Sequence, residues 1–368
     1  MPRHIVFLIH GMGLQPAGDQ DREKWFTPMV AALDKGWKSF APLQALQRER
    51  LIEYVPISYD EVFRNYLGKV SSHAQALSAF MPAGKLASFI NELGDAGEAP
   101  DFFWDDVFDV LFYRYGADHF RQLHVTVSDQ IAKAVQERWD RQGNADTEFS
   151  MIAHSLGTAV AHGALNRLGG GKLGTSAAFK LGGPFFLKTY MTLANVSQVL
   201  WWGEHALYDA TIVRPNMPTR PGYVDTFLNV RNAADPFPMP RRFAPVNWGR
   251  RYRELVVQHV HMLNVHDYCH YLCHPRVTGN FFQSLLGKLV FPVVALDETA
   301  QKFDDLPPLD DEAQRAKIRQ VVSAFIVELR AAFEEGQAPL EGTVELVARV
   351  ARLAWKLRKS VGAIASLP

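Results

Sequence analysis

Ser155 lies in the sequence Ala153-His154-Ser155-Leu156-Gly157, which has the small-x-Ser-x-Gly spacing of a nucleophile turn. Small residues two positions before and after a serine let a strand and a helix approach each other around a sharply bent backbone. Alanine replaces the more usual first glycine and is the smallest residue that still has a Cβ. An apolar run precedes the serine and a helical pattern follows it. We therefore predict that Ser155 is a nucleophile; a buried serine at an ordinary strand–helix turn is the alternative.

A serine nucleophile needs a base that takes its proton and an acid that orients the base. Asp235 follows a predicted strand over residues 223–230, and Pro236 after it removes a backbone donor and restrains the turn. Asp225 and Asp209 are the competing carboxylates. Asp225 lies inside the predicted strand, where its side chain would point to a face of the sheet. We favour Asp235 as the acid; a plain Asp-Pro turn is the alternative.

Several histidines lie at or after the last predicted strand, residues 255–259. A base must lie in a loop, free to rotate between acid and serine. His266 precedes Asp267, which is an effective N-cap for a helix over residues 268–274. His270 would lie one turn into that helix. We therefore favour His266 as the base and keep His270 as the alternative.

The same segment contains two sets of potential zinc ligands at a spacing of four, namely His266, His270 and His274, and Cys269 with Cys273. Side chains at i and i+4 on a helix can bind zinc. Against a metal site, Pro275 is expected to end the helix, and the cysteines would face a different side from the histidines. No carboxylate motif accompanies them. We predict neither a metal nor a cofactor.

Backbone N–H groups that could bind an oxyanion are expected from two loops. The N–H of Leu156 directly follows the serine and lies at the positive N-terminus of the next helix. Residues 10–13 follow a predicted strand over residues 4–9, and their two glycines let N–H groups point into open space. We predict Met12 as the second donor. The backbone expected to support these donors consists of His10, Gly11, Gly13 and Gly157.

Strand and helix patterns alternate along the chain, which predicts an α/β fold with a mostly parallel central sheet and helices on both faces. Loops at the carboxyl ends of parallel strands share one crevice, so the candidate serine, acid and base can meet there. The remaining predicted strands are at 50–58, at 191–196 and directly before Ser155, and predicted helices are at 25–40, 125–139 and 158–168.

We predict a domain over residues 1–290 and a C-terminal helical extension over residues 291–368 that packs on it. The aromatic-rich segment 60–120 interrupts the strand–helix alternation and is expected to form a helical cap or lid. An aromatic core of its own is the alternative. Apolar residues recur at helical spacing over 310–335 and 342–359. The basic face of the second helix could contact a membrane, although we favour a solvated face.

Composition is that of an ordinary globular protein, with 48% apolar residues in a chain of 368. Lysine plus arginine balances aspartate plus glutamate at 39 each, which provides no electrostatic reason to expect nucleic acid. No apolar run has the length of a membrane-spanning helix, and the N-terminal apolar run ends without a cleavage site. Two cysteines four residues apart fit a reducing compartment. We predict a cytoplasmic protein.

The chain resembles a serine α/β-hydrolase of the lipase/esterase type, in the lipase-like group that includes relatives of the glycosylphosphatidylinositol inositol-deacylases. The resemblance covers roughly residues 4–290. The predicted nucleophile, acid and histidine occur along the sequence in the order that is typical of this fold. The motifs that carry it are His10-Gly11-Met12-Gly13, Ala153-His154-Ser155-Leu156-Gly157, Asp235-Pro236, and His266 with the later Tyr271-Leu272-Cys273-His274-Pro275.

This resemblance implies an α/β-hydrolase fold and a carboxylic-ester hydrolase that uses Ser155, Asp235 and His266 without a cofactor. The alanine at the first glycine position departs from the commonest motif, and so does the crowd of histidines around the base. The expected partner is a small ester or lipid-like substrate, with no nucleic acid. A catalytically silent, hydrolase-like binding or assembly module and an acyltransferase with the same residues are the alternatives. We make no prediction of oligomeric state.

Overall fold

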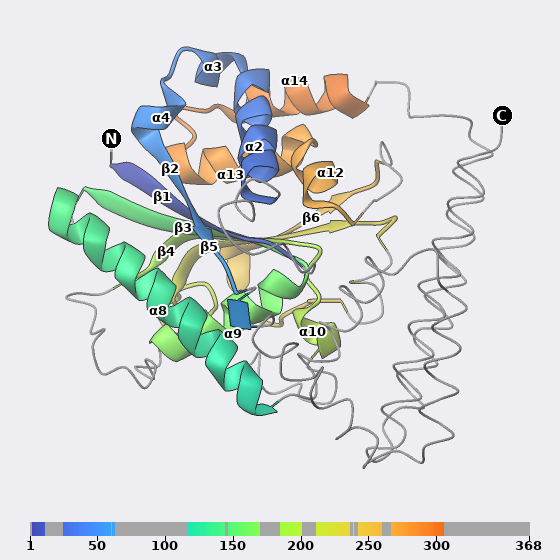
Figure 1. The fold of residues 1–368 in the computed structure, drawn as a ribbon. Coiled ribbons are helices and arrows are strands. Elements are labelled where there is room, and N and C mark those ends of the chain that lie inside the picture. Colours follow the sequence, from blue (N-terminus) through green and yellow to red (C-terminus); the bar gives the residue numbers. More distant parts are fainter. Residues whose placement is uncertain are drawn as a thin grey trace, which may run out of the picture.

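A computed structural model places one sheet between two layers of helices (Figure 1). All six strands in the described part of the chain are parallel, which confirms the predicted α/β class with a parallel central sheet. The structure describes residues 2–11, 25–59, 61–62, 117–143, 146–169, 185–200, 211–235, 238, 242–259 and 266–304.

The sheet has the strand order β2-β1-β3-β4-β5-β6. The order reverses beside β1, because the chain runs outward to β2 and later returns to place β3 on the other side of β1. Such a reversal opens a crevice at the carboxyl ends of the two strands beside it. The strands are β1 (Arg3–Ile9), β2 (Ile52–Ile57), β3 (Thr147–His154), β4 (Leu187–Leu193), β5 (Val224–Asn232) and β6 (Tyr252–Val257).

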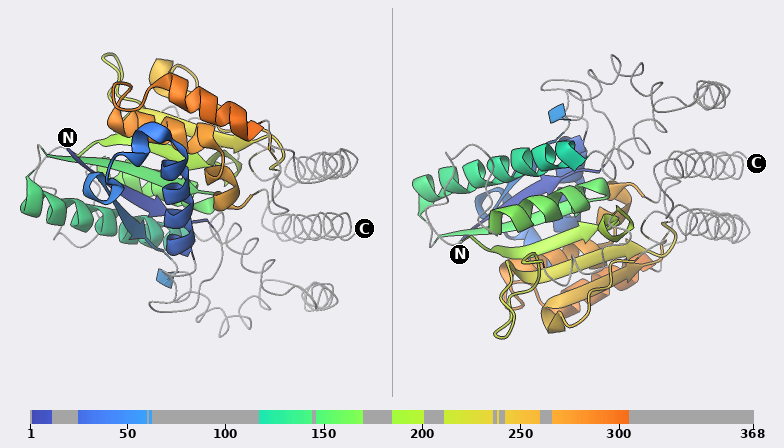
Figure 2. Two further views of the ribbon diagram at one scale, coloured as in Figure 1. Left: turned by 90° about the horizontal axis from the view of Figure 1, so that it is seen from above. Right: turned by 90° about the horizontal axis from the view of Figure 1, so that it is seen from below.

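Helices cover both faces of the sheet, as predicted, and the two views in Figure 2 show one layer each. One face packs against α8 (Ala117–Gln142) and α9 (Leu156–Gly169). The other face packs against α2 (Thr27–Ser39), α12 (Tyr268–Leu272), α13 (Pro275–Leu286) and α14 (Val293–Asp304). Short helices are α3 (Ala41–Gln44), α4 (Arg48–Leu51), α10 (Ser197–Leu200) and η2 (Gly249–Arg251).

The strand β1 explains why both layers are needed. Its side chains alternate between the faces of the sheet, as in any strand. Ile5, Phe7 and Ile9 lie in the buried cluster under α8 and α9, whereas Val6 and Leu8 lie in the cluster under α2 and α13. A parallel strand with apolar residues on both faces is stable only when helices cover both.

Some predicted boundaries were wrong. The strand expected at 191–196 spans Leu187–Leu193, because Ala194 turns the chain with a φ of 49°. The helix expected over 268–274 ends at Leu272.

Pro275, which was expected to end a helix, begins the next one instead. It occupies the first turn of α13, where a proline lacks only an N–H that would be unpaired anyway. The His274 side chain caps this helix by accepting a hydrogen bond from Arg276 N at 3.1 Å.

Several predictions fall outside the described residues. They concern nearly all of the predicted cap at 60–120, the predicted helices at 310–335 and 342–359, and Met12 and Gly13. At the start of the predicted extension, Phe291 and Leu296 belong to the buried cluster under α2 and α13. The boundary at residue 290 stays a prediction. Among the helices that the structure describes, none combines the length and apolarity needed to cross a bilayer.

Candidate active site

Ser155 occupies the single-residue turn between β3 and α9. Its φ is 50°, in the left-handed region that residues with a side chain rarely adopt. The turn is held on both sides: Ser155 N donates to Leu193 O at 3.0 Å, and Ser155 O accepts from Thr158 N at 2.9 Å. The Thr158 hydroxyl donates to the same carbonyl at 2.6 Å. Strain that several hydrogen bonds maintain is typical of functional turns.

Two glycines let the loop after β1 lie against this turn. A Cβ added to Gly157 would lie 2.1 Å from the backbone oxygen of His10, which is far inside van der Waals contact. A Cβ added to Gly11 would lie 2.8 Å from both the Ser155 Cβ and the His154 Nδ1. The small residues in the sequence motif therefore serve close backbone approach between β1 and α9.

The three residues predicted from the sequence as nucleophile, base and acid lie in one hydrogen-bonded chain. His266 Nε2 lies 2.7 Å from Ser155 Oγ, and His266 Nδ1 lies 2.8 Å from Asp235 Oδ2. Ser155 is 1% exposed and Asp235 is 0% exposed, while the His266 side chain retains 14% exposure. Ser155 follows β3, Asp235 follows β5, and His266 comes after β6. The parallel sheet therefore brings distant parts of the chain together.

The donors and acceptors in the Ser155–His266–Asp235 hydrogen bonds follow from the chemistry of the carboxylate and the hydroxyl. An ionised carboxylate can only accept hydrogen bonds, so Nδ1 of His266 carries a proton toward Asp235. In the neutral imidazole Nε2 is then an acceptor, and Ser155 Oγ donates to it. This is the protonation state in which an imidazole can take a proton from a serine, while the carboxylate stabilises the imidazolium that forms.

A buried tyrosine, Tyr271, contacts the Asp235 carboxylate. The Tyr271 hydroxyl lies 2.6 Å from Asp235 Oδ2, the oxygen that also faces His266. Asn232 N donates to this hydroxyl at 3.1 Å, and Asp235 N donates back to Asn232 O at 3.1 Å. Tyr271 belongs to one of the motifs that carry the family resemblance, but no function was predicted for it. Its position one turn into the helix that begins after His266 was the available signal.

The residue before Ser155 contacts the segment that carries His266. His154 Nε2 lies 2.6 Å from the backbone carbonyl of His266, and the two rings are 5.1 Å apart. Since a carbonyl only accepts, Nε2 of His154 carries the proton. Burial, with a smaller contribution from His266, lowers the pKa of His154 well below its usual range. His154 therefore stays neutral and acts as a donor, a role that the sequence did not reveal.

The loop after β1 is held at its start by Tyr59. The Tyr59 hydroxyl lies 3.1 Å from His10 O and 2.7 Å from Gly11 O. The His10 ring contacts those of Trp25 and Tyr59, with centroid distances of 4.6 and 5.1 Å. Gly11 thus leaves β1 beside Ser155. Met12 lies outside the described part of the chain, so its role as an oxyanion donor stays a prediction; Leu156 N directly follows Ser155 at the start of α9.

The alternative base, His270, lies in a different environment. It is fully buried, and its ring stacks on that of His259 at a centroid distance of 4.2 Å. His274, the third residue in this spacing, pairs through Nε2 with Asp304 Oδ1 at 3.3 Å. Burial lowers the pKa of His274 to about 4, despite the opposing effect of Asp304.

The competing acids and the two cysteines were the other candidates from the sequence. Asp225 forms an exposed ion pair with Arg251, whereas Asp209 lies outside the described residues. Cys269 and Cys273 are free thiols. Over the ranges that the structure describes, no three histidine, cysteine or carboxylate side chains converge as metal ligands would.

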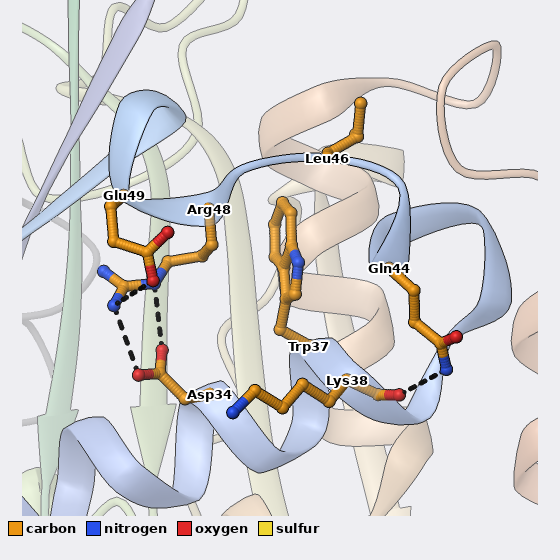
Figure 3. A pocket seen from close by; sticks show the side chains of 7 residues that line it. All are labelled: Asp34, Trp37, Lys38, Gln44, Leu46, Arg48 and Glu49. Atoms are coloured by element: carbon orange, nitrogen blue, oxygen red, sulfur yellow. Dashed lines mark hydrogen bonds and ion pairs between the residues drawn. The ribbon is translucent and has the colours of Figure 1, made fainter.

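A separate hollow of about 210 Å³ lies on the surface of α2 and α4 (Figure 3). Arg48 lies between two carboxylates there: its Nε is 3.0 Å from Asp34 Oδ1, and its Nη2 is 3.3 Å from Glu49 Oε1. Because α4 directly precedes β2, this hollow is at the amino edge of the sheet, opposite Ser155. It is lined by Asp34, Trp37, Lys38, Gln44, Leu46, Arg48 and Glu49.

Comparison of the chain with known protein families, curated proteins and solved structures yields no match. The arrangement around Ser155 therefore has to be interpreted from its own chemistry. It contains a strained serine, an imidazole that can accept the serine proton, and a buried carboxylate behind that imidazole. Together these groups can activate a hydroxyl for attack on an electrophilic carbon.

Proposed function

We propose that the protein is a serine hydrolase of carboxylic esters that works through an acyl-enzyme on Ser155. The observation that carries the proposal is the unbroken chain from Ser155 Oγ through His266 to Asp235, with contacts of 2.7 and 2.8 Å. The left-handed conformation of Ser155 supports it, because such strain is rare unless a site requires it. The resemblance of the sequence motifs to lipases and esterases agrees with the same reaction.

In the proposed reaction His266 takes the proton of Ser155 as Oγ attacks the ester carbonyl. The N–H of Leu156 and the predicted N–H of Met12 stabilise the negative oxygen of the tetrahedral intermediate; one such donor is typically worth about 10²–10³ in kcat. The intermediate collapses as the imidazolium protonates the leaving alcohol. Water, deprotonated by His266, then attacks the acyl-enzyme and releases the acid. No cofactor enters these steps.

The proposed substrate is a small ester or lipid-like molecule rather than a nucleic acid, and the proposed location is the cytoplasm. A chain-length series of p-nitrophenyl esters measures the preferred acyl group. The same series with added alcohols separates hydrolysis from acyl transfer, because an acyltransferase would divert the acyl group to the alcohol.

A fluorophosphonate probe tests the proposal directly, because it reacts covalently with an activated serine. We expect labelling of the wild type and none of Ser155→Ala. Ser128→Ala is the matched control: Ser128 is a buried serine of α8 whose hydroxyl donates to backbone carbonyls, and its loss should leave labelling intact. Equal labelling of wild type and Ser155→Ala would contradict the proposal. An unlabelled, folded wild type without esterase activity would favour the binding-module alternative.

A further inference from the structure

The contacts of the Tyr271 hydroxyl determine which group receives its proton in a hydrogen bond. It lies 3.1 Å from Asn232 N and 2.6 Å from Asp235 Oδ2. A backbone N–H can only donate, so the phenol oxygen accepts from Asn232. The phenol proton must then point to the carboxylate. Tyr271 is fully buried, and burial beside Asp235 raises its pKa well above the usual range, so the proton remains in place.

We propose that Tyr271 is a positioning residue that orients the Asp235 carboxylate and limits its basicity toward His266. The catalytic consequence rests on the proposed function, whereas the effect on the imidazole does not. Both the phenol and His266 Nδ1 contact the same carboxylate oxygen, Oδ2. A hydrogen bond from a second donor draws charge away from that oxygen, and less charge then remains to stabilise an imidazolium.

The local chain explains why one residue can hold both partners. Asp267 caps α12 by accepting from Cys269 N at 2.6 Å, so the helix begins directly after His266. Tyr271 lies one turn further along this helix and reaches back to Asp235. The base and the group that positions the acid are therefore carried by a single segment of six residues. A shift of this segment would move both relative to Ser155.

Other titratable and charged groups near the pair come from several elements. His154 faces His266 from the end of β3, and His10 influences His154 from the end of β1. Arg231 on β5 acts on Tyr271 and is itself paired with Glu254 at 3.0 Å. On the side of α12, the His270 ring lies 3.4 Å from the Asn232 amide. These groups are unchanged when only the phenol oxygen is removed, so they provide a constant background for the test.

The test is Tyr271→Phe, which retains the ring and removes the hydroxyl. Relative to the wild type, kcat should fall about tenfold or more while KM stays nearly constant, because the Asp235 carboxylate is no longer held in the orientation that aligns His266 with Ser155. The acid limb of the kcat/KM profile should move to higher pH by about half a unit or more, because His266 then faces a more basic carboxylate. A control is Tyr252→Phe, which removes a phenol that donates to Phe243 O at 3.2 Å on the edge strand.

Titration of the His266 imidazole by ¹⁵N NMR, assigned with His266→Gln, reads the same effect without catalysis. A higher pKa of His266 in Tyr271→Phe than in wild type supports the proposal, even if the labelling of Ser155 fails and the hydrolase function is withdrawn. The proposal is overturned if the His266 titration and the pH profile match those of wild type and only thermal stability falls, as for Tyr252→Phe. Labelling of Ser155 thus tests the proposed hydrolase function, and the His266 titration tests the proposed role of Tyr271.

Discussion

The carboxyl and amino edges of the sheet both carry dense polar side chains, but these side chains are arranged differently. At the carboxyl edge Ser155, His266 and Asp235 form one directional chain of hydrogen bonds in a nearly buried setting. At the amino edge Arg48 is paired with carboxylates on two sides, beside an open hollow. Charges at the amino edge neutralise one another, whereas at the carboxyl edge the Ser155 hydroxyl faces a proton acceptor, His266 Nε2.

This contrast shows that polar density alone does not identify a site. The charged hollow on α2 and α4 offers no strained backbone and no proton acceptor aimed at a nucleophile. The serine turn has both, and it lies where the strand order reverses beside β1. A functional site is better recognised by the direction of its hydrogen bonds and by maintained strain than by the number of its charges.

The largest expected effect separates two histidines within the carboxyl edge. His266→Gln should lower kcat by about 10⁴-fold or more, because the serine loses its proton acceptor. His270→Gln should retain most of the activity and lose thermal stability, since His270 is a fully buried ring stacked on His259. Steady-state hydrolysis of a p-nitrophenyl ester and thermal unfolding measure both. An equal loss of kcat in the two variants would overturn the assignment of the base.

Much of this edge could be predicted from the sequence because its signals are local. Ser155 lies in a short motif, and Asp235 and His266 each follow a predicted strand at a turn or a cap. The contacts of Tyr271, His154 and Tyr59 could not be predicted in this way. Each of them reaches a residue 36 or more positions away, for example Tyr271 to Asp235 and His154 to His266.

The α/β class was predictable for a similar reason, since apolar runs and helical spacing reveal the layers. The ends of elements were less predictable. Pro275 was expected to stop a helix and instead begins α13. The prediction failed because proline is common both in the first turn of a helix and just after the last turn, and the sequence does not distinguish the two positions. β4 ends early because Ala194 adopts a left-handed turn, which its residue type does not favour.

A smaller effect is expected where the loop after β1 meets the serine turn. Alanine is normally favoured over glycine in a helix by about 1 kcal/mol. Gly157→Ala should nevertheless lower the free energy of unfolding by about 1–3 kcal/mol, the usual cost of overpacking. The reason is the added Cβ, which would lie 2.1 Å from the His10 carbonyl oxygen. Hydrolysis should fall as well, because the loop must move away from Ser155.

Gly169→Ala in the same helix is the matched control for this prediction. Its added Cβ would meet side-chain atoms of Ile212 and Tyr223 at 3.1 Å, and these can shift by a few tenths of an ångström. Urea unfolding and ester hydrolysis should show little change in this variant. If Gly157→Ala behaves like Gly169→Ala, the close approach between β1 and α9 is not required for the site.

The smallest effect is expected at the amino edge, where Arg48→Gln removes the cation between Asp34 and Glu49. Partly exposed ion pairs contribute little, so the free energy of unfolding should fall by no more than about 1 kcal/mol. Burial raises the pKa of Asp34 and Arg48 opposes that effect, so the variant should raise this pKa further. Some packing is also lost, since the guanidinium lies 5.0 Å from the centre of the Tyr54 ring.

A double-mutant cycle with Asp34→Asn isolates the pair itself, and its coupling energy should shrink in high salt because screening weakens exposed pairs. Ester hydrolysis should be unchanged in all three variants. A loss of kcat in Arg48→Gln without a loss of stability would show that the two edges are coupled. The charge cluster around Arg48 would then contribute to function and not only to stability.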